Sequence, residues 1–158
     1  MGIKYNHAGR QDIPECYITK IGPESLGDVQ AGTNELHACF TDAAKVVYDF
    51  PPAFEALKFK ATGGPEGLAQ AVVGIYQTLH IIRAQHMVTN VVVQRTRETT
   101  ATMRSYITAA HMHPDERVLN ATAKYLDDVR YIDGQWKMAH RQVTITSLTH
   151  LPAFSVGQ

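Results

Sequence analysis

Two histidines, His86 and His111, carry the chemistry that the sequence suggests most directly. An imidazole has an unperturbed pKa of about 6.5, so near neutral pH it accepts a proton readily and, once charged, donates one. Two imidazoles in one dry pocket could therefore divide the work of a general base and a general acid. That combination suits elimination, isomerisation or an aldol-type cyclisation of a substrate with a carbonyl group.

The elements that must position these histidines are long strands in the second half of the chain. Residue types that favour strands, with side chains alternating between two faces, predict strands at 86–94, 100–113, 117–131 and 135–147. Asp133-Gly134 predicts a tight hairpin between the last two. His86 then opens the first of these strands, and His111 stands near the end of the second.

Helices and one further strand are predicted before them. Asn34 is a candidate N-cap for a short helix, and residues 45–50 predict a strand. The sequence GGPE at 63–66 predicts the start of a helix that runs to about His80. Residues 1–22 predict an irregular arm. Helices followed by long antiparallel strands are typical of the α+β class rather than the α/β class.

Alternation along the strands indicates which side chains share a face. In strand 100–113 one mostly apolar face is predicted to be concave and core-facing, and it carries Met103, Ser105, Ile107, Ala109 and His111. The hairpin faces are mixed, since Tyr125 shares one with Asp127, and Trp136 shares another with His140. Mixed faces are typical of a pocket lining or a subunit contact. The residues predicted to contact substrate are Tyr106, Tyr125, Trp136, Met103 and Ile107.

Composition limits the class of protein. A chain of 158 residues, 44% hydrophobic and 19% charged, fits one globular domain spanning residues 1–158. The net charge is zero and no basic stripe stands out, so nucleic acid is not a predicted partner. A net charge near zero also favours self-association. Without an apolar N-terminal core or a long apolar run, we expect a cytoplasmic protein with no membrane partner.

Several motifs receive a structural interpretation. The cysteines, Cys16 and Cys39, form no C-x-x-C pair and are expected to be ordinary thiols. The H-x-H spacing of His111 and His113 would need a third ligand, so no metal is predicted. Asp127-Asp128 is interpreted as a solvated pair. No phosphate-binding or dinucleotide-binding motif is present, and no cofactor is predicted.

Five segments taken together resemble a known family. They are FTDAAKVVYDF, GGPEGL, QHMVTNVVV, TATMRSYITAAH and YIDGQWKMAHRQV. Their order and spacing over residues 34–147 resemble the SnoaL-like branch of the NTF2-like superfamily, with the scytalone dehydratases as the nearest functional analogue. The resemblance implies an NTF2-like cone, in which a strongly curved mixed sheet wrapped by helices surrounds a deep pocket. It also implies a homodimer or homotrimer formed through the outer face of the sheet.

The same resemblance implies a set of site residues. Scytalone dehydratases eliminate water without a metal or organic cofactor, using a histidine pair, an aspartate and tyrosines. His86 and His111 fall at the histidine positions, Tyr48 at a pocket tyrosine, and Asp28 where the acid would lie. The chain departs from the family pattern at Gly27, where a tyrosine is usual. On the third long strand, Ala123 and Tyr125 replace a serine and an asparagine.

The sequence therefore predicts a cofactor-independent lyase or isomerase that acts on an apolar oxygenated small molecule. His86 and His111 would be the general acid and base, Tyr48 would polarise an oxygen, and Asp28 would orient or assist. Two alternatives stay open. One is a non-catalytic binding or assembly domain, because NTF2-like folds serve both purposes. The other is hydrolysis of an epoxide, which would need more carboxylates in the pocket.

Overall fold

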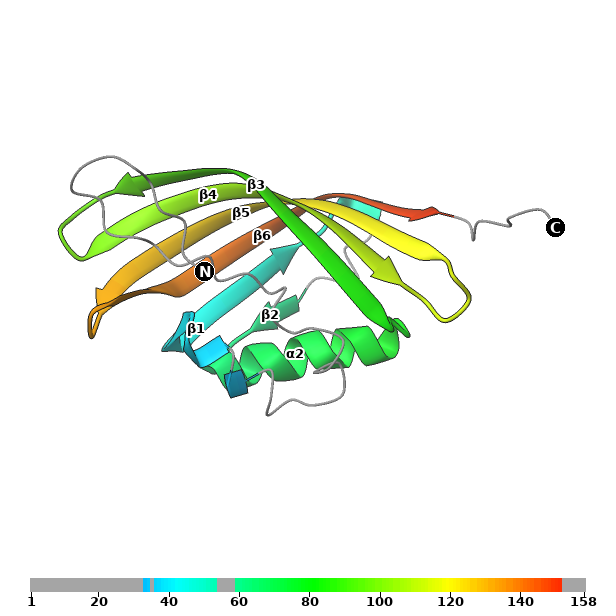
Figure 1. Ribbon diagram of the computed structural model, residues 1–158, viewed down its shortest axis with the longest axis horizontal. Coiled ribbons are helices and arrows are strands. Elements are labelled where there is room, and N and C mark those ends of the chain that lie inside the picture. The colour runs from blue at the N-terminus through cyan, green and yellow to red at the C-terminus, as the bar shows by residue number, and fades with distance from the viewer. Residues whose placement is uncertain (1–32, 35, 54–58, 152–158) are drawn as a thin grey trace.

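The fold is a curved sheet with a helix beneath its concave face (Figure 1). The computed structural model describes residues 33–34, 36–53 and 59–151. The predicted arm at 1–22 and Asp28 lie outside these residues. The elements are β1 (Phe40–Asp49), β2 (Phe59–Ala61), α2 (Gly64–Thr78), β3 (Arg83–Arg95), β4 (Thr100–Met112), β5 (Val118–Ile132) and β6 (Gln135–Leu151).

The sheet is mixed and has six strands in the order β2-β1-β6-β5-β4-β3. Strands β3 to β6 form an antiparallel meander, whereas β1 runs parallel to β6 and antiparallel to β2. The predicted α+β class and curved mixed sheet are confirmed. Some bounds differ from the sequence analysis. Strand β1 begins at Phe40, before the predicted 45–50, β3 begins at Arg83 instead of 86, and β6 ends at Leu151 instead of 147. Strand β2 was not predicted, because three residues are too short for a periodic signal.

Helix α2 begins as the sequence predicts. Gly63 and Gly64 have φ angles of 92° and 67°, Pro65 lies in the first turn, and Glu66 supplies a negative charge there. A Cβ atom on Gly64 would lie 2.0 Å from the carbonyl oxygen of Asp42, so only glycine lets the helix approach β1 this closely. Thr33 is already helical, so Asn34 lies within the helix and does not precede its first residue. The prediction of Asn34 as an N-cap is therefore wrong.

The hairpin between β5 and β6 confirms the predicted turn. Asp133 and Gly134 both have positive φ, 49° and 81°, as a type I′ turn requires. Burial alternates from Ala101 to Ala109 in β4 and from Ala121 to Val129 in β5, so the predicted faces of these strands are confirmed. Within the described residues, no helix has the length and apolar character needed to cross a membrane.

A β-bulge corrects the predicted face of β6. Val129 pairs with Met138, but the next residue back, Asp128, pairs with His140, so β6 carries one extra residue between them. The bulge reverses the alternation. Trp136 and Met138 are buried before it, and Arg141 is buried after it. The prediction that His140 shares a face with Trp136 is therefore wrong, and the His140 side chain is 41% exposed.

The same bulge creates an ion pair in the core. Arg141 lies directly opposite Asp127, and its Nε and Nη2 atoms donate to the two carboxylate oxygens at 2.7 and 2.8 Å. Neither side chain is exposed. The expectation that Asp127 is solvated is wrong, because strand alternation turns it inward while Asp128 faces outward.

Cys39 also differs from expectation. It is buried in the core and disulfide-bonded, so the prediction of ordinary thiols is wrong. The other cysteine, Cys16, lies outside the described residues.

Candidate active site

A cavity of about 630 Å³ lies between helix α2 and the concave face of the sheet. None of its lining residues in the described chain carries a carboxylate, an ammonium or a guanidinium group, and apolar side chains predominate. They are Tyr48, Phe50, Gln70, Ala71, Val72, Gly74, Ile75, Tyr76, Thr78, Leu79, Ile81, His86, Ile107, Ala109, His111, Leu119, Ala121, Ala123, Tyr125, Val143, Ile145 and Leu148. A cavity of this size and character suits an uncharged organic molecule.

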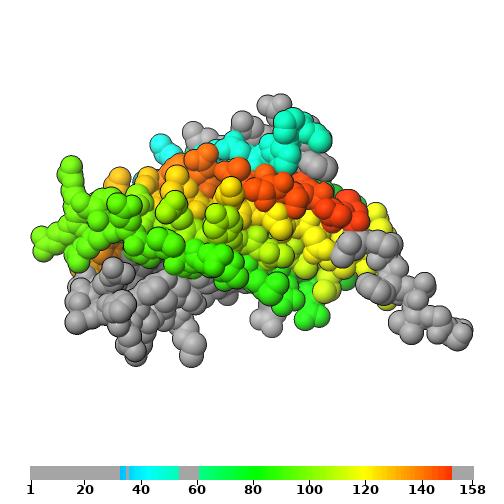
Figure 2. All heavy atoms as spheres, turned by 90° about the horizontal axis from the view of Figure 1, so that it is seen from above, coloured from blue at the N-terminus to red at the C-terminus, as the bar shows by residue number. Residues whose placement is uncertain are grey.

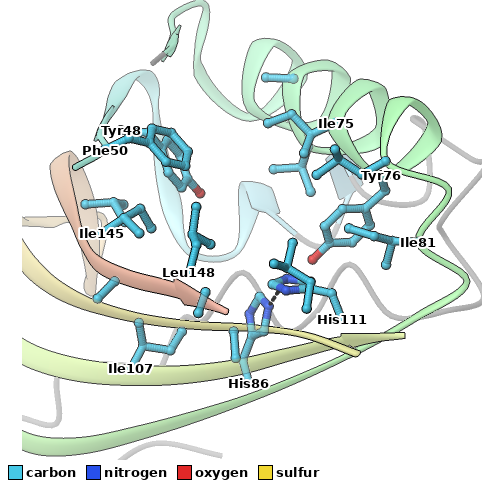
Figure 3. Close-up of a pocket in the computed structure, with 18 of the residues that line it drawn as sticks. Tyr48, Phe50, Ile75, Tyr76, Ile81, His86, Ile107, His111, Ile145 and Leu148 are labelled. Atoms are coloured by element: carbon cyan, nitrogen blue, oxygen red, sulfur yellow. Dashed lines mark hydrogen bonds between the residues drawn. The ribbon is translucent and has the colours of Figure 1, made fainter. Parts of the chain in front are cut away.

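His86 and His111 meet inside this cavity (Figure 3). Their Nε2 atoms are 3.1 Å apart, so one imidazole donates a hydrogen bond and the other accepts it. The rings meet edge to face, with centroids 5.2 Å apart. His86 pairs across the β3–β4 ladder with Ala109, two residues before His111 on the same face, so the histidines are diagonal neighbours.

A bulge in β3 is what places His86 on this face. Thr89 pairs with Tyr106 but Val92 pairs with Arg104, so β3 has one extra residue around Asn90, whose φ is 53°. If the register beyond the bulge continued unbroken, His86 would pair with Ala110 and point away from the cavity. The contact between the histidines therefore depends on a single inserted residue.

Both imidazoles are held in the neutral form. Burial, and then the proximity of His111, lower the pKa of His86 to about 4. Burial also lowers the pKa of His111. The Nδ1 atom of His86 is buried and has no hydrogen-bond partner among the described residues. At neutral pH the pair is thus a proton acceptor that is shielded from bulk water.

Two tyrosines face the histidine pair from other elements (Figure 3). Tyr48, near the end of β1, lies across the cavity from the histidines, with its hydroxyl directed inward. Tyr76, on α2, packs its ring against that of His111 in a T-shaped arrangement, with centroids 5.7 Å apart. Burial raises the pKa of both phenols, so each keeps its proton and serves as a hydrogen-bond donor.

A third tyrosine connects the cavity to the buried ion pair. Tyr125 lines the cavity, and the guanidinium carbon of Arg141 lies 4.2 Å from the centroid of its ring. Burial, opposed by the positive charge of Arg141, raises the pKa of Tyr125 to about 12. For Arg141 itself burial acts to lower the pKa, but the charge and hydrogen bonds of Asp127 outweigh it and the pKa is raised. The ion pair of Arg141 and Asp127 therefore stays charged behind the cavity wall.

The structure separates the residues proposed from the sequence into three groups. His86, His111, Tyr48, Ile107 and Tyr125 all line the cavity. Met103 and Trp136 are buried but lie outside the lining. Trp136 packs instead against Tyr131, with ring centroids 5.4 Å apart.

Tyr106 does not reach the cavity. Strand alternation turns it to the outer face of the sheet, where it is 48% exposed, so its prediction as a pocket residue is wrong. Asp28 lies outside the described residues.

Two residues of the site were missed by sequence reasoning. Tyr76 lies on the buried face of a regular helix, where its position indicates only core packing. Arg141 lies in a segment whose alternation is reversed by a bulge that leaves no clear sequence signal. Among the described residues, no group of three or more His, Cys, Asp or Glu side chains is arranged to hold a metal ion.

The fold and cavity define a pocket protein of the NTF2-like superfamily, and comparison with known proteins identifies the branch. Residues 30–142 match the model of the SnoaL-like domain, so the chain belongs to the SnoaL-like family. No curated protein sequence matches the chain.

Solved structures share the fold. A putative scytalone dehydratase from Novosphingobium aromaticivorans is 26% identical, with a TM-score of 0.60 and 86% of each chain covered. Hexachlorocyclohexane dehydrochlorinase LinA-type3 from Novosphingobium barchaimii is 16% identical, with a TM-score of 0.64, covering 89% of this chain and 88% of that one. A protein with a cystatin-like fold from Nostoc punctiforme is 25% identical, with a TM-score of 0.53, covering 78% and 81%.

Proposed function

We propose that this protein is a cofactor-independent lyase of the dehydratase type, or a related isomerase, acting on an uncharged oxygenated small molecule. The observation that carries the proposal is the 3.1 Å contact between His86 and His111 inside an apolar cavity. The likeness to a structure described as a putative scytalone dehydratase supports dehydration among the reactions that such a pair can perform.

The proposed chemistry begins with proton removal. One imidazole of the pair accepts a proton from the carbon next to a carbonyl group. The second imidazole stabilises the resulting imidazolium through the Nε2 contact, because the positive charge strengthens that hydrogen bond. Tyr48, on the opposite side of the cavity, donates a hydrogen bond to the carbonyl oxygen as it becomes an enolate.

The cavity lining supports a neutral substrate. Within the described lining there is no free charge to pair with an ionic group, and the guanidinium of Arg141 is already bound to Asp127. Burying an unpaired charge in such a cavity would cost several kcal/mol. We therefore propose ring-containing ketones with a β-hydroxyl group as the substrate class to be tested first.

The two alternatives make different demands on the same cavity. A non-catalytic binding protein would use the apolar lining but would not need the histidine contact. An epoxide hydrolase would need a carboxylate to activate water, and the described lining supplies none. The contact between two neutral imidazoles favours the lyase or isomerase proposal over both.

The test is an elimination assay on a panel of neutral β-hydroxy ketones built on one, two or three rings, with loss of water followed by mass spectrometry. We expect His86→Gln and His111→Gln to retain binding and to lose turnover by about 100-fold or more, because the amide keeps a polar atom near the Nε2 position but is not a base. His150→Gln, at an exposed histidine of β6 outside the lining, is the matched control. Ligand binding with no turnover by the wild-type protein would contradict the proposal and favour the binding alternative.

A further inference from the structure

We infer that Tyr76 is a third catalytic residue, which donates its hydroxyl proton to the oxygen that leaves the substrate. The inference rests on the proposed lyase function and deepens it. The observation that carries it is the juxtaposition of Tyr76, His111 and His86 along one wall of the cavity, with the Tyr76 hydroxyl directed into the open space beside the histidines (Figure 3).

The geometry forms a continuous row of rings. Tyr76 contacts His111 with centroids 5.7 Å apart and an interplanar angle of 65°, and His111 contacts His86 with centroids 5.2 Å apart. A substrate atom next to the base would therefore lie within reach of the phenol as well. In an elimination, the carbon that loses a proton and the carbon that loses oxygen are neighbours, so base and donor must stand side by side.

The end of helix α2 fixes the position of Tyr76. The amide of His80 donates to the carbonyl of Gln77 at 3.2 Å, and the amide of Ile81 donates to the carbonyl of Tyr76 at 2.8 Å. His80 has a φ of 51°, which completes a Schellman motif with Tyr76 at its C3 position. Ile81 and Tyr76 both belong to the buried core cluster, as the hydrophobic contact of this motif requires. These bonds fix the backbone at Tyr76, and burial of its ring restricts the positions that the side chain can take.

The chemistry requires such a donor. The lowered pKa values leave both imidazoles uncharged at neutral pH, so the pair can accept the carbon-bound proton but neither ring starts as an acid. Hydroxide is a poor leaving group unless it is protonated as the bond to carbon breaks. The phenol of Tyr76 keeps its proton because burial raises its pKa.

Protons and electron pairs are conserved in the proposed elimination. The imidazole takes the proton from carbon, the electron pair of that bond forms the double bond, and the carbon–oxygen bond breaks with its electrons on oxygen. Tyr76 protonates this oxygen to give water. The imidazolium then returns its proton to the phenolate, directly or through the neighbouring ring, so that all groups recover their starting state.

The leaving-group dependence of the reaction tests this role. The probes are matched pairs of a β-hydroxy ketone and its acetate ester, beginning with the aldol of benzaldehyde and acetone and its acetate, both of which give benzylideneacetone. Acetate leaves without protonation. We expect Tyr76→Phe to slow elimination of water by about 100-fold while slowing elimination of acetate by less than about 3-fold. His86→Gln should slow both reactions.

Controls separate the possible outcomes. Tyr106→Phe removes the same hydroxyl from the outer face of the sheet and should change neither rate. Unfolding curves of Tyr76→Phe establish that the variant is folded, since the ring that contacts His111 is retained. Equal losses on both substrates would show that Tyr76 is structural and would overturn the inference while leaving the lyase function standing. A wild-type protein that eliminates from neither member of any pair across the one-, two- and three-ring ketones would overturn the proposed function and this inference with it.

Discussion

Arg141 and Asp127 form a bidentate ion pair in the core, with the guanidinium of Arg141 packed 4.2 Å from the ring centroid of Tyr125. Both side chains are fully buried. The pair therefore supports the wall of the cavity from behind, and it keeps a strong positive charge close to a pocket tyrosine without exposing that charge to the ligand.

Breaking this pair should destabilise the protein strongly. Asp127→Ala leaves a buried guanidinium without its counter-charge, and we expect a loss of about 3 to 5 kcal/mol in the free energy of unfolding. Replacing both partners by apolar side chains, as in Asp127→Leu with Arg141→Met, removes both charges and should recover most of that loss. Urea denaturation of the single and double variants measures the difference. A double variant no more stable than Asp127→Ala would show that the pair acts through more than its charges.

The histidine pair should make stability and activity depend on pH in a defined direction. The pKa of His86 is about 4 in the folded protein, below the value of about 6.5 expected in the unfolded chain, so the unfolded state binds more protons between these values. Stability should therefore fall as the pH decreases from about 6.5 to 4, by about 2 to 3 kcal/mol.

His86→Gln provides the control for this prediction. The variant lacks the titrating group, so its unfolding free energy should change less over the same pH range. Activity that requires neutral His86 should be maintained well below pH 6.5 and decline only as the pH approaches about 4. A midpoint near 6.5 for His86 in an NMR titration of the folded protein would contradict both expectations.

Filling the cavity should abolish ligand binding at little cost in stability. Ala109 lines the cavity opposite His86 on the neighbouring strand, so a leucine there can occupy empty space. We expect Ala109→Leu to unfold within about 1 kcal/mol of the wild-type protein and to lose binding of aromatic ketones in calorimetric titrations. Ala101→Leu, in the packed core outside the lining, should instead cost about 1 to 3 kcal/mol through overpacking and leave binding intact.

The outer face of the sheet is a proposed site of self-association. Figure 2 shows this face, formed by the meander. Large apolar side chains on β3, β4 and β5 are exposed there, including Met87 at 54%, Tyr106 at 48% and Leu126 at 46%. We expect a homodimer or homotrimer that buries this patch, because exposed apolar side chains gathered on one face mark contact surfaces.

A charge introduced within the patch tests this proposal. Leu126→Lys should shift the mass measured by light scattering toward that of the monomer. Ile82→Lys, at an exposed apolar residue that precedes β3, should not. A wild-type protein that is monomeric at high concentration would contradict the proposal.

The sequence by itself determined most of the elements, β2 excepted, and most of their faces. Alternation predicted that His111, Ile107 and Ala109 share the concave face of β4, and Asp133-Gly134 predicted the hairpin, because local residue preferences and a period of two govern both. The family pattern also placed Tyr48 and His86 among the candidate site residues, and both line the cavity.

Only the tertiary structure decided which of these residues meet. Counted back from the hairpin without interruption, Asp127 would lie opposite His140; the bulge in β6 brings Arg141 there instead. The bulge in β3 likewise turns His86 toward His111. A bulge shifts every later side chain to the other face, and its position depends on how the two paired strands meet, which the period of two in either strand's sequence does not specify. The approach of Tyr76 to the histidines depends in the same way on how α2 packs beneath the sheet, which helical periodicity alone does not specify.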